Sequence, residues 1–208
     1  MLEIGRFAAA QPRAVVLAPS GPGWVLAAAF VGGLWLCLWR GRLRWLGLPL
    51  ATIGLWWPTP APPNLWIASD GANLAIRSGD TAVMARPNSK RFAAEFWARR
   101  RGLTIAEQPL FLCNRSRCLP GLDAPPIALW SGRRAPTAAQ LTELCALSRT
   151  VVSRAALDRP PPACRDVRLL DVDDFAAGAA AELWRTSSGW RIVWANDARA
   201  ARPWGRPR

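Results

Sequence analysis

The segment from Pro63 to Ala85, PNLWIASDGANLAIRSGDTAVMA, contains three short apolar runs separated by turn-forming residues. Each run has the length and side-chain content that are typical of a strand. The intervening DGA and GD favour tight turns between strands. We therefore predict three strands joined by short turns, at residues 64–69, 73–78 and 81–86.

The next stretch, NSKRFAAEFWARRRG, predicts a helix over residues 88–102. Asn88 or Ser89 is the expected N-cap, and Gly102 is the expected end. The predicted helix places Phe92, Phe96 and Trp97 on one face.

The remaining sequence continues the same alternation of short strands and helices. A second helix is predicted from Thr137 to Ser148. Strands are predicted at PLFLC, PIALWS, RTVVS, DVRLLD, AAELWR and GWRIVWA. Residues 62–208 are therefore expected to form one sheet-dominated α+β domain with the helices packed on its sheet.

Two apolar stretches with a basic segment between them precede this domain. Residues 24–39 (WVLAAAFVGGLWLCLW) carry no charge, RGRLR follows, and a second apolar stretch extends to Ala61. Tryptophans stand at the ends of both stretches, as at membrane interfaces: Trp24, Trp39, Trp45, Trp56 and Trp57. Because basic loops are usually retained in the cytoplasm, we expect a transmembrane helical hairpin over residues 20–61 with a cytoplasmic turn at Arg40, Arg42 and Arg44.

Two other interpretations of this region compete with a membrane hairpin. Both apolar stretches are short for a bilayer, which would suit a pair of buried core helices. A cleaved signal peptide is disfavoured, because the first stretch starts far from Met1 and a second stretch follows it. Upstream, residues 1–19 mix apolar and basic side chains and predict an amphipathic segment lying on a membrane surface.

The composition of the chain is strongly basic. Its 27 basic and 14 acidic residues give a formal charge of +13, and Lys90 is the only lysine. Such a surplus favours anionic partners such as nucleic acid, phospholipid headgroups or an acidic protein. The competing explanation is a high-GC genome, which enriches arginine together with alanine, proline, glycine and tryptophan.

The chain contains no histidine. This excludes Ser-His-Asp and Cys-His catalysis, histidine metal ligands and histidine proton shuttles. Carboxylate and cysteine chemistry remain open.

Five cysteines are present, one in the first apolar stretch and four in the predicted domain. The pair in LCNRSRC is too widely spaced for a Cys-x-x-Cys redox or zinc motif. If the basic turn faces the cytoplasm, the domain lies on the oxidising side, where an even number of cysteines indicates disulfides. Among the three possible connectivities, the most local one joins Cys113 to Cys118 and Cys145 to Cys164, and leaves Cys37 free.

The order of these segments resembles the C-terminal end of ComEC-family competence proteins, the inner-membrane channels for DNA uptake, in their alphaproteobacterial form. The segments that carry the resemblance are GGLWLCLWRGRLRWLGLPL, PNLWIASDGANLAIRSGDTAVMA, KRFAAEFWARRRG, LCNRSRC, LTELCALSRTVVSRAALDRPPPAC and the final ARPWG. The resemblance implies an inner-membrane protein with its C-terminal domain in the periplasm. Partners would be the membrane, single-stranded DNA and a separate membrane-channel portion of the same family.

The chain departs from the family in two ways. Family members are much longer, so this chain resembles a truncated form without the channel core. Many members end in a metallo-β-lactamase-like domain with an H-x-H-x-D-H metal motif, which a chain without histidine cannot contain. Any such fold here is expected to be degenerate and metal-free, so we expect no enzyme activity and no cofactor.

Two kinds of charged cluster are candidate sites. Asp171, Asp173 and Asp174 would either cap a short helix or hold Mg²⁺ for a nuclease, and capping is the more common role. The basic clusters are either solvated surface or sequence-independent DNA contacts. The candidate DNA contacts are Lys90, Arg91, Arg99, Arg100, Arg101, Arg133 and Arg134, with Trp97 and Trp130 as the nearest stacking candidates.

These observations predict a ComEC-like protein that assists single-stranded DNA import without catalysis. The alternative is a membrane-anchored periplasmic interaction module, or a remnant, with no role in DNA binding. A metal-dependent nuclease built on the aspartate cluster is the third hypothesis.

Overall fold

The structure is a computed structural model, and it describes Glu3, Gly5, Phe7 and residues 22–58, 61–187 and 189–200. The chain divides into two compact units, residues 1–62 with 100–102 and residues 63–99 with 103–208. Most of the predicted amphipathic segment, residues 1–19, lies outside the described residues.

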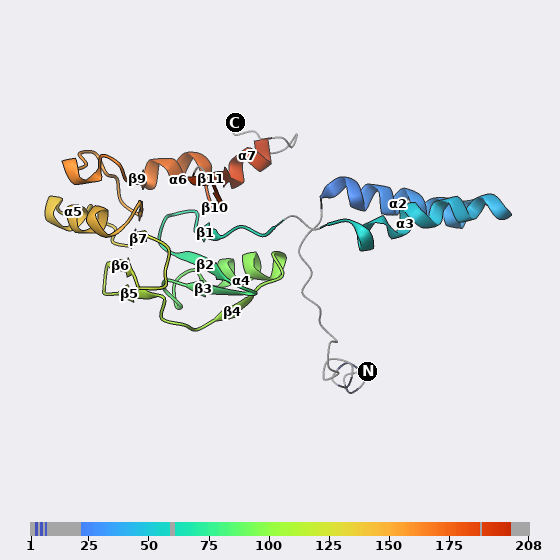
Figure 1. Ribbon diagram of the computed structural model, residues 1–208, viewed down its shortest axis with the longest axis horizontal. Coiled ribbons are helices and arrows are strands. Elements are labelled where there is room, and N and C mark those ends of the chain that lie inside the picture. Colours follow the sequence, from blue (N-terminus) through green and yellow to red (C-terminus); the bar gives the residue numbers. More distant parts are fainter. Residues whose placement is uncertain are drawn as a thin grey trace. The chain divides into compact units, whose positions relative to one another are not determined.

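The first unit contains a helical hairpin. Helix α2 (Gly23–Leu38) and helix α3 (Gly47–Trp56) lie alongside each other and are joined by the 3₁₀ turn η1 (Arg42–Leu46) (Figure 1). Glycine permits their close approach: a Cβ atom on Gly32 would lie 2.3 Å from the backbone nitrogen of Ala51. The rings of Trp24 and Trp57 meet edge to face at the open end, with centroids 4.4 Å apart.

The predicted transmembrane hairpin over residues 20–61 is wrong. The hairpin is helical, but none of the helices in the described part of the chain is long and apolar enough to cross a membrane. The physical reason is length: α2 spans 16 residues and α3 spans 10. At 1.5 Å per residue these correspond to about 24 and 15 Å, against a hydrocarbon thickness of about 30 Å. The predicted cytoplasmic position of Arg40, Arg42 and Arg44 depended on that span and loses its basis.

The second unit is built on two mixed sheets, so the α+β class is correct. The first sheet has the strand order β11-β10-β1-β2-β3-β4, and only β3 and β4 pair in parallel. Its strands are β1 (Leu65–Ile67), β2 (Leu74–Ser78), β3 (Thr81–Met84), β4 (Thr104–Ala106), β10 (Ala181–Thr186) and β11 (Gly189–Trp194). Gly71 and Gly79 adopt positive φ angles of 62° and 61° in the β1–β2 and β2–β3 turns, a conformation that glycine adopts readily.

The second sheet has the order β5-β6-β7-β8-β9, in which β7, β8 and β9 are parallel. Its strands are β5 (Phe111–Cys113), β6 (Arg117–Pro120), β7 (Ile127–Trp130), β8 (Thr150–Ser153) and β9 (Arg168–Leu170). Helix α5 (Ala138–Leu147) crosses from β7 to β8 and begins at a capping box, in which Thr137 Oγ1 accepts from the Gln140 amide and Gln140 Oε1 accepts from the Thr137 amide.

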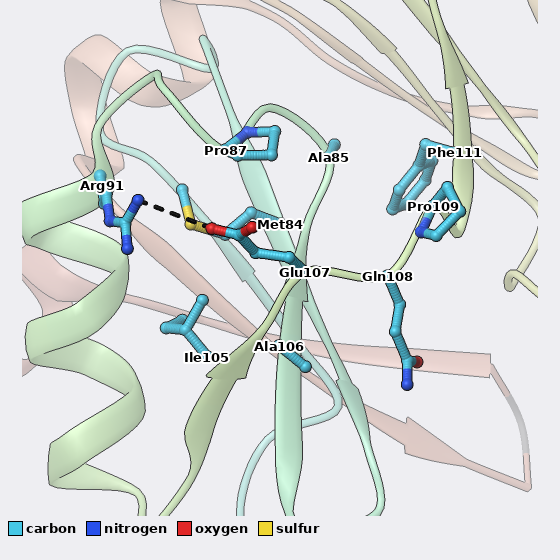
Figure 2. A pocket seen from close by; sticks show the side chains of 10 residues that line it. All are labelled: Met84, Ala85, Pro87, Arg91, Ile105, Ala106, Glu107, Gln108, Pro109 and Phe111. Carbon is cyan, nitrogen blue, oxygen red and sulfur yellow. Dashed lines mark ion pairs between the residues drawn. The ribbon is translucent and has the colours of Figure 1, made fainter.

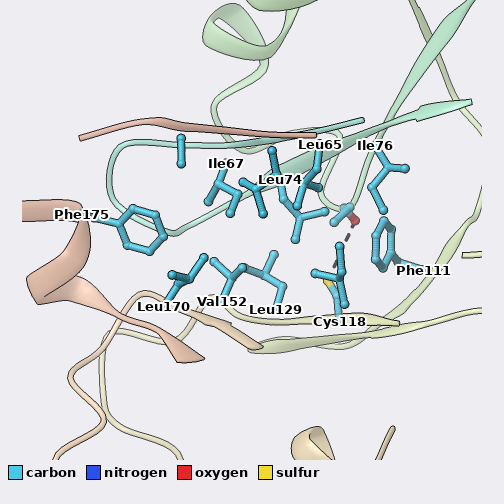
Figure 3. Packing of buried hydrophobic residues seen from close by; sticks show 14 residues of the cluster. Leu65, Ile67, Leu74, Ile76, Phe111, Cys118, Leu129, Val152, Leu170 and Phe175 are labelled. Atoms are coloured by element: carbon cyan, nitrogen blue, oxygen red, sulfur yellow. Dashed lines mark hydrogen bonds between the residues drawn. The ribbon is translucent and has the colours of Figure 1, made fainter. Parts of the chain in front are cut away.

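The two sheets face each other across the main hydrophobic core. Leu65, Ile67, Leu74 and Ile76 of the first sheet pack against Phe111, Leu129, Val152 and Leu170 of the second (Figure 3). Helix α4 (Arg91–Arg100) packs on the outer face of the first sheet, and α5 packs on the outer face of the second. The layer order is therefore helix, sheet, sheet, helix.

Three short helical segments complete the described part of the unit. The 3₁₀ turn η2 (Pro162–Cys164) precedes β9, α6 (Val172–Gly178) lies between β9 and β10, and α7 (Ala195–Ala200) follows β11. Phe175 of α6 closes one end of the core and contacts Trp194 edge to face, with ring centroids 5.7 Å apart.

Candidate nucleic-acid interface

Helix α4 buries a narrow stripe of small and aromatic side chains. Ala94, Trp97 and Ala98 lie at i, i+3 and i+4 spacing and pack on Trp66, Ala75, Ala82 and Met84 of the sheet. The indole nitrogen of Trp97 donates to Glu182 Oε1 at 2.9 Å, which fixes the ring against β10. The opposite side of the helix therefore faces outward.

The outward side of α4 carries two exposed phenylalanines and an arginine. Phe92 is 82% exposed and Phe96 is 63% exposed. Arg99 is also exposed and lies one turn further along the same row, because residues at i, i+4 and i+7 share a helix face. We call Phe92, Phe96 and Arg99 the aromatic ridge. The prediction that Phe92 and Phe96 share a face with Trp97 is wrong, because Trp97 points into the core.

Lys90 and Arg91, at the N-terminal end of α4, are neutralised by neighbouring carboxylates. Lys90 Nζ lies 3.1 Å from Asp70 Oδ2, which Arg154 Nη2 also approaches at 3.2 Å. Arg91 Nε donates to Glu95 Oε1 at 2.8 Å. That hydrogen bond and the charge of Glu95, with a smaller contribution from Glu107, raise the pKa of Arg91 above its ordinary value. These two cations are less available to a phosphate than a free arginine.

The other predicted DNA-contact residues occupy two separate places. Arg99, Arg100 and Arg101 lie together at the C-terminal end of α4, and Arg100 and Arg101 each interact with another group. Arg133 and Arg134 lie in the segment leading into α5, on the sheet that α4 does not cover. Within the described residues Arg99, Arg133 and Arg134 form no ion pair. The seven predicted cations are therefore distributed over both outer layers rather than gathered on one face.

Trp97 and Trp130 are each only 5% exposed, so neither offers a ring face to a base. Trp130 packs in the cluster under α5, and its indole nitrogen donates to the Arg134 carbonyl at 2.8 Å. The exposed rings nearest to the predicted cations are instead Phe92 and Phe96.

A pocket of about 290 Å³ lies beside the N-terminal end of α4 (Figure 2). Its walls are largely apolar and include Met84, Ile105 and Phe111. Arg91 and Glu107 stand at its rim and form an ion pair, with Nη1 and Oε1 3.8 Å apart. Because both charges are already matched, the pocket offers a ligand apolar contact and little net charge.

A larger and more polar groove of about 840 Å³ lies elsewhere in the second unit. It is formed by the residues that precede or begin β7, β8 and β9, together with the turn between β10 and β11. Arg149, Arg168 and Arg185 line it with a single carboxylate, Asp166, and Trp190 forms part of its wall. We call these five residues the basic groove.

The basic groove was missed by the sequence interpretation because its arginines are isolated in sequence. The available signal was strand alternation: Ala181 and Leu183 point into the core, so Arg185 is the next side chain on that face. In β9, Leu170 points into the core and Arg168 lies on the same face.

The aspartate cluster caps α6. Asp171 Oδ1 accepts from the Asp173 amide at 3.0 Å, and Asp174 Oδ2 accepts from the Asp171 amide at 3.1 Å. The second oxygen of Asp171 accepts from the Leu157 amide at 3.0 Å. Within the described parts of the chain, no cluster of three or more cysteine or acidic side chains could hold a metal ion.

Both predicted cysteine pairs lie at disulfide distance. Cys113 and Cys118 face each other on β5 and β6 with an S–S distance of 2.05 Å, and Cys145 of α5 meets Cys164 of η2 at 2.01 Å. Cys37 is free and exposed on α2. One bridge therefore closes the β5–β6 turn, and the other ties the proline-rich loop to α5.

Comparisons with family models, with curated proteins and with solved structures find no match for this chain. The comparisons therefore add no support to the resemblance to the ComEC family.

Proposed function

We propose that this chain is a ComEC-like protein of a DNA-uptake apparatus whose second unit contacts single-stranded DNA without catalysing a reaction. The observation that carries the proposal is the aromatic ridge, in which two exposed rings and an unpaired arginine follow one another along α4. Exposed rings next to a cation are the usual means of holding single strands independently of sequence.

The chemistry of the ridge fits a single strand better than a duplex. An unpaired base can stack on Phe92 or Phe96, whereas the bases of a duplex are already stacked on each other. Stacking on an aromatic side chain contributes about 1 to 3 kcal/mol per base. Arg99 then supplies a phosphate contact that depends on charge rather than on sequence.

The overall charge of the second unit supports the same partner. Residues 63–99 and 103–208 contain 20 basic and 13 acidic side chains, a formal charge of +7. Within the part of the unit that the structure describes, Arg99, Arg133 and Arg134 form no ion pair. Long-range attraction of a polyanion follows from this surplus.

The two disulfides support a periplasmic location for the second unit. Structural disulfides persist in oxidising compartments and are rare where thiols are kept reduced. Both bridges join segments that are already packed together, as expected for structural rather than catalytic disulfides.

Association with the inner membrane is the second part of the proposal. Large apolar side chains are exposed along the hairpin, among them Phe30, Leu55 and Trp56. The charges in its described residues are Arg40, Arg42 and Arg44, with no carboxylate. A surface that combines apolar side chains with arginines is suited to the boundary of an anionic bilayer.

Replacing both ridge rings, in the variant Phe92→Ala/Phe96→Ala, should weaken binding of a single-stranded oligonucleotide by about ten- to a hundredfold. The fold should persist, because both rings are exposed. Equilibrium titration of a labelled oligonucleotide at low salt measures the effect.

The matched control is Leu122→Ala/Leu147→Ala, which removes two exposed apolar side chains elsewhere in the unit. It should leave the affinity within about twofold. Equal losses in the two variants, or no binding by the parent chain, would replace the DNA proposal with that of an interaction module without a DNA role.

A further inference from the structure

The basic groove lies where the inner faces of the two sheets change from apolar to charged. In β10, Ala181 and Leu183 are fully buried, and Arg185 follows them on the same face. In β9, Leu170 packs in the core, and Arg168 lies two residues before it. Both arginines therefore extend the inner faces beyond the core, at the edge where β7, β8 and β9 begin.

The backbone holds the groove residues in fixed positions. Arg168 is next to Thr150 in the parallel β8–β9 ladder, and its amide donates to the Arg149 carbonyl at 3.0 Å. Arg185 pairs directly with Trp190 across the antiparallel β10–β11 ladder, which puts both side chains on the same face. Arg168 Nη1 also reaches the Trp190 carbonyl at 3.4 Å. Arg168 and Arg185 thus lie on strands, and Arg149 directly precedes β8.

The charges in the groove are not balanced. Three arginines face one aspartate, and none of the four forms an ion pair within the described residues. Three arginines that line one concave site favour an anion that accepts several hydrogen bonds, and phosphate is such an anion. Trp190, which packs partly on the core, adds a planar wall beside them.

We infer that the basic groove binds a nucleotide unit, with its phosphate on Arg149, Arg168 and Arg185 and its base against Trp190. The ligand class is a phosphate bonded to a flat aromatic ring system, either as a free nucleotide or as one residue of a single strand. This site is separate from the aromatic ridge and does not require DNA binding by α4.

Calorimetric titration of the full chain with adenosine 5′-monophosphate, adenosine and inorganic phosphate tests the site. The nucleotide should bind more tightly than either part alone. Arg168→Gln and Arg185→Gln should each weaken nucleotide binding about tenfold, because each removes a charge-assisted hydrogen bond to phosphate. Inorganic phosphate binding as tightly as the nucleotide, or no nucleotide binding, would overturn the inference.

Arg191→Gln is the matched control, because Arg191 follows Trp190 on the opposite face of β11 and lies over the Trp184 ring. It should change the affinity by less than about twofold. A tenfold loss in this variant would show that general charge, and not the groove, holds the ligand.

A short single-stranded oligonucleotide distinguishes the two sources of the ligand. The test uses the ridge variant Phe92→Ala/Phe96→Ala as background. If Arg185→Gln then abolishes oligonucleotide binding, the groove binds one residue of a single strand. If the mononucleotide binds more tightly than the oligonucleotide in this background, the ligand of the groove is a free nucleotide. If Arg185→Gln changes the binding of neither the mononucleotide nor the oligonucleotide, the inference is contradicted and the ridge proposal is unaffected.

Discussion

Removing both disulfides, by replacing Cys113, Cys118, Cys145 and Cys164 with alanine, should lower the free energy of unfolding by about 5 kcal/mol. The bridges have sequence separations of 5 and 19 residues. Their loss restores loop-closure entropy to the unfolded chain, which corresponds to about 2 kcal/mol for the short loop and about 3 kcal/mol for the long one. A loss of 5 kcal/mol approaches the whole stability of an ordinary domain. Urea unfolding monitored by circular dichroism measures it.

Cys37→Ala is the control for this experiment, since Cys37 is exposed and unbridged. It should leave the unfolding midpoint of the second unit unchanged. A quadruple variant as stable as the parent chain would show that the bridges do not form, and the periplasmic proposal would lose its main support.

Reversing the three turn arginines, Arg40→Glu, Arg42→Glu and Arg44→Glu, should weaken binding to anionic lipid vesicles by at least about a hundredfold. Each basic residue near an anionic membrane contributes about 1 kcal/mol, so losing three of them costs about 3 kcal/mol before any repulsion by the new carboxylates. Vesicle sedimentation at several lipid concentrations measures the partition.

A variant with the same change in net charge separates a local effect from a general one. Arg115→Glu, Arg133→Glu and Arg134→Glu lie in the second unit and should reduce vesicle binding by much less. If this variant is as defective as the turn variant, the hairpin is not the membrane-contacting element.

The strands near Pro63 could be predicted because local chemistry determines them. The turns at Gly71 and Gly79 require positive φ angles, which glycine adopts readily, and the runs between them are apolar enough to be buried. The end of α4 could be predicted for the same reason, because Gly102 follows the helix with a positive φ of 73°. The cysteine pairing followed from sequence proximity, which here coincided with spatial proximity.

The hairpin could be predicted as helical but not in its extent. The basic segment at residues 40–44 separates the two apolar stretches, and the chain forms the 3₁₀ turn η1 over Arg42–Leu46, whose preceding residue Gly41 has a φ of 90°. The turn includes Trp45 and Leu46 of the second apolar stretch, so α3 begins only at Gly47. Hydropathy reports which residues avoid water and not where a helix ends.

The faces of α4 could not be assigned from the sequence because both sides carry aromatic residues. Burial is decided by the sheet, which accepts Trp97 beside two alanines and leaves Phe92 and Phe96 outside. The basic groove also depends on the tertiary structure, because its arginines come from β9, from β10 and from the residue before β8, which lie far apart in the sequence. Clusters of charge in the sequence therefore do not locate a site on the surface.

The most direct test of the central claim is the salt dependence of single-stranded DNA binding by the full chain. We predict detectable binding at low salt and a linear fall in the logarithm of the association constant with the logarithm of salt concentration. For three phosphate contacts the slope should be about −2. A slope near zero, or no binding at low salt, would contradict the account.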